Sequence, residues 1–231
     1  MVKLVMIPAL CCDGDLYATL AEGLRDLVSI ETVNPAAATF DGCVRQVLDA
    51  VDGDFIVMGT SFGGHVARET ALAAPGRVKG LWIMGAGAGA VASPDAGIER
   101  VTKLRDGRQE EIYRGFAETI TWLHGPRGKE AADAFYRMAQ RCDPLDVALR
   151  AEALNARLDR WSDLSRIACP TLLLWGRHDR FSPPADGLHM AGLIPHSRYV
   201  EIPDCGHLPS LEAPDEVIDI ASHWLKDSGL A

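Results

Sequence analysis

The sequence has no cluster of basic residues. It contains 23 Lys and Arg against 32 Asp and Glu, which gives a formal net charge of -9. Because binding to nucleic-acid phosphates requires concentrated positive charge, this composition argues against a nucleic-acid partner. No apolar run approaches the roughly 20 residues that a membrane-spanning helix needs, so we expect no membrane span.

The six cysteines show neither zinc-binding nor redox spacing. They are scattered along the chain and form no C-x-x-C pair, and the two adjacent ones, Cys11 and Cys12, are too close for an ordinary disulfide. We therefore expect reduced thiols without a catalytic role in a cytoplasmic protein. The sequence calls for no metal and no other cofactor.

Apolar segments separated by helical patterns organise most of the chain. The runs 4–7, 55–58, 78–84 and 171–175 predict buried strands, and the segments 28–33 and 198–202 predict two more. Parallel strands require crossover connections, so this alternation predicts an α/β fold with a mostly parallel central sheet of about six strands and helices on both faces. A chain of 231 residues with 48% hydrophobic content fits one domain over residues 1–231.

The N-terminal region is expected to form part of this core. Its first apolar run follows a single lysine and superficially resembles a signal segment, but it is short, and no small residue precedes either nearby cysteine. We expect a buried strand there, followed by a helix with Asp15 as its N-cap and leucines at helical spacing from Leu16 to Leu27.

The segment from Ser93 to Ser165 has a different pattern. It is rich in charged and helix-forming residues, lacks a convincing strand, and carries apolar residues at helical spacing between Gly and Pro breaks. We interpret residues 93–165 as a short helical cap inserted over the functional edge of the sheet. An ordinary helical layer without any role as a lid is the alternative.

The sequence around Ser61 has the pattern of a nucleophile elbow. The apolar run 55–58 leads into Gly-Thr-Ser-Phe-Gly, and a helical pattern follows from Gly63. In such an elbow a strained turn exposes the serine, and small residues two positions before and after it, here Gly59 and Gly63, let the strand and helix approach. Ser61 is therefore the candidate nucleophile, although a chain with 22 glycines can contain this pattern in an ordinary turn.

An acid and a base follow later strands. Asp179 comes after the run 171–175, and His207 after the segment 198–202. A serine needs a base to take its proton, and the base needs a carboxylate to orient it. We favour Asp179 over Asp204 as that carboxylate because Asp204 is too close in sequence to His207 to pair with it comfortably.

Three stretches together resemble the α/β-hydrolase fold superfamily, in particular its compact single-domain esterases. They are Gly59–Gly64, the segment 169–184 that includes W-G-R-H-D-R-F, and the segment 202–217 that includes P-D-C-G-H-L-P. The resemblance implies that Ser61 is the nucleophile, Asp179 the triad acid and His207 the general base. It places the oxyanion hole at the backbone N–H groups of Phe62 and Leu10. Where many members have His-Gly after the first strand, this chain has the loop Pro8-Ala9-Leu10-Cys11-Cys12-Asp13, which leaves the second donor open between Leu10 and a neighbour.

The resulting hypothesis is a cofactor-independent serine hydrolase acting on carboxylic esters or thioesters of small to medium size, as a monomer or homodimer. Trp122, Phe116 and the loop 85–89 are candidates for the substrate pocket, with core packing as the alternative role for Phe116. Fold and triad do not fix the reaction. A lyase, a cyclase, a cofactor-free oxygenase and a non-catalytic small-molecule receptor on the same fold remain alternatives.

Overall fold

A parallel six-stranded sheet forms the centre of the computed structural model, which describes residues 1–231. Its order is β2-β1-β3-β4-β5-β6, and every neighbouring pair is parallel, which confirms the predicted fold class. The strands are β1 (Lys3–Ile7), β2 (Ser29–Thr32), β3 (Phe55–Thr60), β4 (Val78–Met84), β5 (Thr171–Gly176) and β6 (Ser197–Ile202). Strands β3 and β5 are buried along their whole length, as expected for the centre of a covered sheet.

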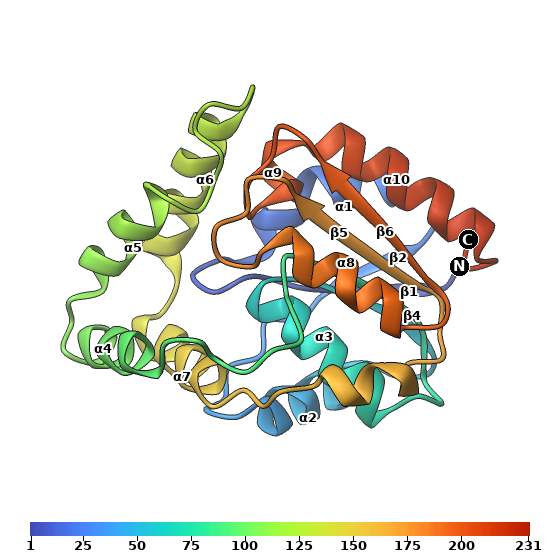
Figure 1. Ribbon diagram of the computed structural model, residues 1–231, viewed down its shortest axis with the longest axis horizontal. Coiled ribbons are helices and arrows are strands. Elements are labelled where there is room, and N and C mark those ends of the chain that lie inside the picture. The colour runs from blue at the N-terminus through green and yellow to red at the C-terminus, as the bar shows by residue number, and fades with distance from the viewer.

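Helices cover both faces of the sheet (Figure 1). Helices α1 (Ala18–Leu24) and α10 (Pro214–Asp227) pack together on one face, and α2 (Phe40–Ala50), α3 (Phe62–Ala73) and α8 (Pro184–Leu193) lie on the other. Two short elements complete this part of the chain, the 3-10 helix η1 (Gly14–Tyr17) and α9 (Pro209–Glu212). None of the helices combines the length and the apolar character needed to cross a bilayer.

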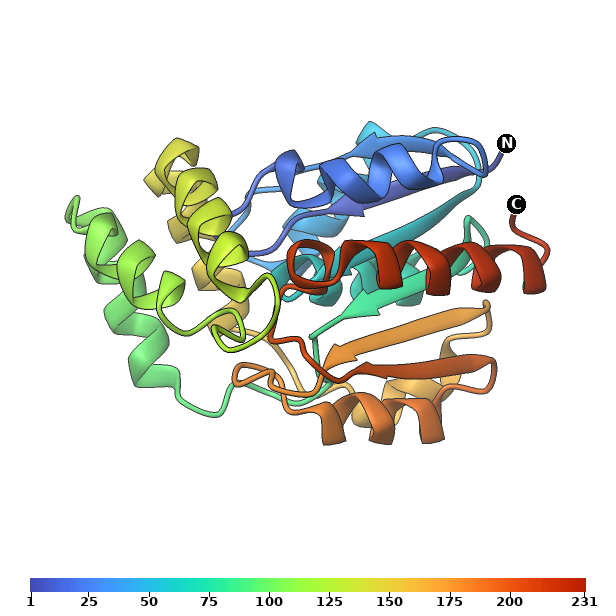
Figure 2. The same cartoon turned by 90° about the horizontal axis from the view of Figure 1, so that it is seen from above.

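Four helices fill the long connection between β4 and β5. They are α4 (Pro94–Arg105), α5 (Gln109–Ala117), α6 (Gly128–Arg141) and α7 (Pro144–Asn155), and the 3-10 helix η2 (Trp161–Arg166) leads back to the sheet. Figure 2 shows this helical segment beyond the end of the sheet to which the strand arrows point, while both chain termini lie at the opposite end. It therefore faces the carboxyl ends of the strands, where functional groups gather in parallel sheets.

The start of the first helix differs from the sequence-based expectation. Asp13, not Asp15, is the capping residue, because its side chain accepts a hydrogen bond from the Asp15 N–H at 3.0 Å. The chain begins as η1 and becomes α1 only at Ala18, so Asp15 lies inside the first turn. The helix also ends at Leu24, before the Leu27 of the apolar pattern. The short helix α9 was not predicted.

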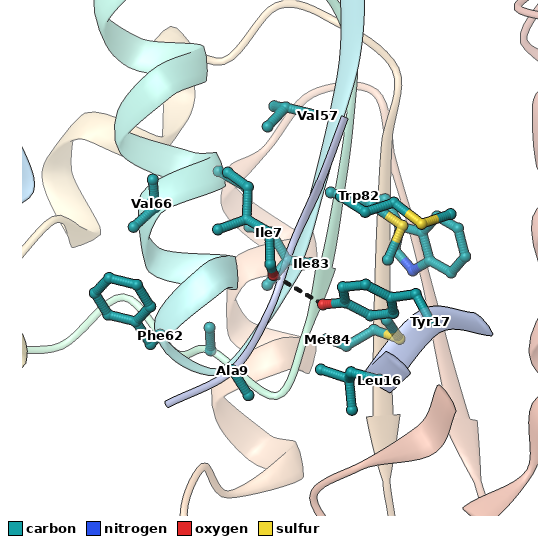
Figure 3. Packing of buried hydrophobic residues seen from close by; sticks show 14 of the residues in the cluster. Ile7, Ala9, Leu16, Tyr17, Val57, Phe62, Val66, Trp82, Ile83 and Met84 are labelled. Carbon is teal, nitrogen blue, oxygen red and sulfur yellow. Dashed lines mark hydrogen bonds between the residues drawn. The ribbon is translucent and has the colours of Figure 1, made fainter. Parts of the chain in front are cut away.

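The Tyr17 hydroxyl ties the end of β1 to the end of β3. It donates to the Ile7 carbonyl at 2.9 Å, accepts from the Thr60 N–H at 2.9 Å, and lies 3.0 Å from the Thr60 hydroxyl. Figure 3 shows the bond to Ile7 within the apolar core, where Tyr17 is only 1% exposed. Because Thr60 precedes Ser61, this one side chain fixes both the elbow and the loop after β1.

Replacing Tyr17 with Phe is expected to lower the free energy of unfolding by about 1–3 kcal/mol, because the Thr60 N–H would lose its buried acceptor. Urea denaturation measures the change. Tyr199→Phe is the matched control, since that half-buried hydroxyl makes one hydrogen bond, to Pro184, and its loss should cost about 0.5–1 kcal/mol. Equal effects of the two variants would contradict the special role of Tyr17.

Candidate active site

Ser61 lies at the turn between β3 and α3 in a strained backbone conformation. Its φ is 54° and its ψ is -117°, and only one other non-glycine residue, Cys11, has a positive φ. Chain packing leaves no room for larger residues beside it: a Cβ on Gly59 would lie 2.2 Å from the Gly63 backbone, and one on Gly63 would lie 1.8 Å from the Ile7 carbonyl oxygen. The sequence therefore holds Ser61 in the geometry of a nucleophile elbow.

Asp179 and His207 meet in the loops after β5 and β6. Gly176 pairs with Ile202 at the ends of these strands, so the loops begin side by side. The His207 Nδ1 atom lies 2.7 Å from the Asp179 Oδ2 atom, and the His207 and Asp179 side chains are 3% and 0% exposed. Asp204, the alternative acid, is exposed. With Nδ1 bonded to the carboxylate, Nε2 is left as the atom that can take a proton.

The second oxygen of Asp179 is also occupied. Oδ1 accepts hydrogen bonds from the N–H groups of Phe181 at 2.8 Å and Ser182 at 2.9 Å, which hold the carboxylate in one orientation. Gly85 lies against the pair with a φ of 58°, and a Cβ there would lie 2.9 Å from Asp179 Oδ2 and 3.0 Å from His207 Nδ1. A glycine at position 85 is therefore required for the pair to form.

Glu212 positions the loop that carries His207, and the sequence reasoning did not identify it. Its carboxylate is 4% exposed and accepts hydrogen bonds from the N–H groups of Gly206 at 2.8 Å and Leu208 at 3.0 Å, the two neighbours of His207. It also accepts from the Trp122 N–H at 2.7 Å. Burial raises the pKa of Glu212, and these three hydrogen bonds act in the opposite direction. The sequence feature that could have identified Glu212 is its position, an acidic residue five positions after His207.

The two expected oxyanion donors lie beside the elbow. Phe62 is the first residue of α3, so its N–H belongs to the helical turn whose amides have no acceptor within the helix. Leu10 follows β1, whose last residue, Ile7, pairs with Gly59, and the Leu10 N–H makes no hydrogen bond within the protein. Both N–H groups remain available to an oxyanion near Ser61, and their role stays a prediction.

A cavity of about 520 Å³ opens onto these groups. Ser61, His207, Leu10 and Phe116 line it, together with loop 85–89 residues and α4 and α7 of the helical segment. Trp122 does not line it. The Trp122 ring instead stacks on His178, with centroids 3.8 Å apart and the planes 9° from parallel.

His65, one turn after the nucleophile, also lines the cavity. Its Nδ1 atom lies 3.2 Å from Arg68 Nη2, and because a guanidinium only donates, Nδ1 is the acceptor and Nε2 carries the proton. Burial lowers the pKa of His65 well below its ordinary value of 6.5, and the charge of Arg68 lowers it further. His65 is therefore a neutral imidazole in the cavity wall.

Neither a thiol nor a metal ion fits the geometry of this site. Cys205 lies two residues before His207 but is buried, and burial raises the pKa of its thiol, which disfavours the nucleophilic thiolate. No group of three or more His, Cys, Asp or Glu side chains is placed to hold a metal ion.

A parallel sheet with an elbow serine after β3, an aspartate after β5 and a histidine after β6 defines the α/β-hydrolase class. Comparison with known sequences agrees: residues 10–220 match the Alpha/beta hydrolase family, and the chain belongs to that family. A 2-hydroxy-6-oxononadienedioate/2-hydroxy-6-oxononatrienedioate hydrolase of Pseudomonas putida is 30% identical over 225 residues, which cover 91% of this chain and 70% of the relative. A similarly named protein of Cupriavidus pinatubonensis is 31% identical, with 71% and 60% covered.

Solved structures give the same fold. A thermophilic esterase from Thermogutta terrifontis, solved with malate bound, has a TM-score of 0.88 and 25% identity, covering 99% of this chain and 90% of that one. The enol-lactonase from Burkholderia xenovorans also has a TM-score of 0.88, at 20% identity, with 97% and 91% covered. The chain spans about 60 to 70% of the length of these two curated relatives.

Replacing Glu212 with Gln is expected to lower kcat on an activated ester by about 10- to 100-fold, because an amide cannot accept all three N–H groups and the His207 loop would shift. KM should change little. Steady-state kinetics with p-nitrophenyl butyrate tests this, and Glu216→Gln, an exposed acid on α10, is the control. An unchanged kcat in the Glu212 variant would show that this carboxylate does not position His207.

Because His65 is neutral in the folded protein, we expect the protein to become less stable as the pH falls. The folded protein keeps His65 neutral, whereas the unfolded chain binds a proton below about pH 6.5, so the free energy of unfolding falls as pH decreases through that value. Between pH 7.5 and 5.5 the wild type should lose on the order of 1 kcal/mol more than His65→Gln, measured by urea denaturation. His223→Gln, which removes an exposed imidazole, is the control. The same pH dependence in wild type and His65→Gln would contradict the assignment.

Proposed function

We propose that this protein is a serine hydrolase that cleaves carboxylic esters or thioesters of small to medium size. The observation that carries the proposal is the hydrogen-bonded pair Asp179–His207 opening onto the same cavity as the strained Ser61. A serine becomes a useful nucleophile only beside a base, and the buried carboxylate gives that base its orientation. We assign no cofactor to this reaction.

The proposed reaction proceeds in two halves. His207 Nε2 takes the proton of Ser61 as the serine oxygen attacks the acyl carbon, and Asp179 stabilises the imidazolium that forms. The N–H groups of Phe62 and Leu10 would receive the negative charge on the carbonyl oxygen. His207 then protonates the departing alcohol or thiol, and the acyl-serine is hydrolysed by a water that His207 activates.

The helical segment between β4 and β5 serves in this proposal as a cap that shapes the pocket. Phe116 from α5 lines the cavity and packs against Phe181, which follows Asp179, at a centroid distance of 5.7 Å. It also packs against Phe135 at 6.3 Å, so Phe116 contributes both to the pocket and to the packing of the segment. Trp122 is not part of this pocket, and its N–H group donates to Glu212.

A second candidate reaction is hydrolysis of a carbon–carbon bond. The relatives from Pseudomonas putida and Cupriavidus pinatubonensis are named as hydrolases of 2-hydroxy-6-oxononadienedioate, a compound without an ester group. The same serine, base and oxyanion donors could act on a ketone carbonyl, because a tetrahedral oxyanion forms there as well. Fold and triad do not decide between the two reactions.

Ser61→Ala is expected to lower turnover of p-nitrophenyl butyrate by about a million-fold without unfolding the protein. A fluorophosphonate should label the wild type on Ser61 alone, as read by peptide mass spectrometry. Ser165→Ala, an exposed serine outside the cavity, should keep full activity. Substantial turnover by the folded Ser61 variant, or labelling at another residue, would refute the proposed nucleophile.

The two candidate reactions can be distinguished by comparing kcat/KM for esters with kcat/KM for 2-hydroxy-6-oxononadienedioate. An ester hydrolase should release p-nitrophenol and form a transient acyl adduct on Ser61, visible in the intact mass after rapid quenching. Hydrolysis of 2-hydroxy-6-oxononadienedioate at a higher kcat/KM than any ester would favour the second candidate.

A further inference from the structure

Arg100 is a cation of the cavity wall that has no polar partner. It lies on α4 of the helical segment and is half-buried, yet its guanidinium makes no hydrogen bond and no ion pair within the protein. Two acids line a neighbouring pocket together with Arg100, and both have other partners: Glu99 pairs with Lys103 at 2.8 Å, and Glu111 with Arg108 at 2.7 Å. A guanidinium carries five N–H donors, so all the hydrogen-bonding capacity of Arg100 is free.

The neighbouring Arg157 is bonded quite differently. Its Nε donates to the Gly89 carbonyl at 3.1 Å, Nη1 to Leu154 at 3.2 Å and Nη2 to Ala90 at 3.4 Å. These bonds hold the loop after β4 in place. No carboxylate neutralises Arg157, and burial, followed by the charge of Arg100, lowers its pKa. The two guanidiniums thus repel each other, and neither forms an ion pair with a carboxylate.

The cavity is cationic although the protein is acidic. Three arginines line it, Arg100, Arg157 and Arg180, against one acid, Asp186, outside the triad. The chain as a whole has a formal net charge of -9. His65 is neutral there, and Asp179 is paired with His207. Positive charge concentrated in one cavity of an acidic chain attracts anions to that cavity.

Packing holds Arg100 in a defined position despite its lack of polar partners. Its guanidinium carbon lies 5.1 Å from the centroid of the Phe116 ring, in cation–π contact. Phe116 is in turn fixed by Phe135 and Phe181. Two apolar side chains of α7, Ala151 and Leu154, line the same cavity and suit the carbon chain of a ligand.

We propose that Arg100 binds a carboxylate of the substrate, so that the protein acts on acyl compounds that carry a free carboxylate away from the bond that is cleaved. This inference rests on the proposed function and names its substrate class. Arg100 is the specificity-determining residue, because it supplies a charged donor pair that an uncharged substrate cannot use. Arg157 adds to the positive potential of the cavity, but its N–H groups are already bonded to backbone carbonyls, including those of Gly89 and Ala90.

The test compares monomethyl adipate with dimethyl adipate, in which a second methyl ester replaces the free carboxylate, with the rate of methanol release per ester group as the readout. The wild type should prefer the monomethyl ester, and Arg100→Met should lower kcat/KM for it by about 10- to 100-fold while changing the dimethyl ester less than about threefold. Arg100→Lys should retain part of the preference. Arg105→Met, an exposed arginine on the same helix that pairs with Glu152, is the matched control.

Binding of adipate itself gives a readout that does not depend on catalysis. Isothermal titration should show adipate binding to the wild type and to Ser61→Ala, with affinity reduced about 10- to 100-fold in Arg100→Met, and no comparable binding of dimethyl adipate. Adipate binding that depends on Arg100 without any ester turnover would overturn the proposed reaction and leave this inference standing. Ester turnover with equal preference for both esters, unchanged in Arg100→Met, would overturn this inference alone.

Discussion

The hydrogen bond between His207 and Asp179 depends on two strands ending side by side. Each residue follows its strand by a few positions, so a shift of β6 against β5 would separate them. The pairing of Gly176 with Ile202 prevents that shift, and the 2.7 Å contact between Nδ1 and Oδ2 is its outcome. The buried carboxylate is stabilised further by two N–H donors, so the charge needed to orient the imidazole is not left unpaired in the core.

The same constraint extends to the nucleophile. Ile7 pairs with Gly59 and Thr60 with Met84, so the loop after β1, the elbow and the Gly85 turn meet at one edge of the sheet. Tyr17 joins the first two of these segments, and Gly85 permits the third to approach the Asp179–His207 pair. A parallel sheet thus brings together groups that are far apart along the chain, because each is attached to the end of a neighbouring strand.

The parts of the site that follow directly from strand ends could be predicted from the sequence. Ser61, Asp179 and His207 each sit after an apolar strand pattern, and their order along the chain matches one class of fold. Glu212 and Tyr17 could not be found in this way, because what matters is which backbone groups their oxygens reach, and that depends on loop geometry. Trp122 shows the opposite case: a large aromatic residue in the right segment whose ring stacks on His178 outside the cavity. Residue type alone does not tell which side of a loop a side chain occupies.

The placement of the chain termini has a practical consequence. Both ends lie at the end of the sheet opposite the helical segment (Figure 2), and helices α4 and α7 of that segment line the cavity. A tag, a fluorophore or a surface linker attached at either end would therefore leave the approach to Ser61 open. For the same reason, attaching the protein to a solid support through either terminus would leave the cavity of each molecule turned toward the solution.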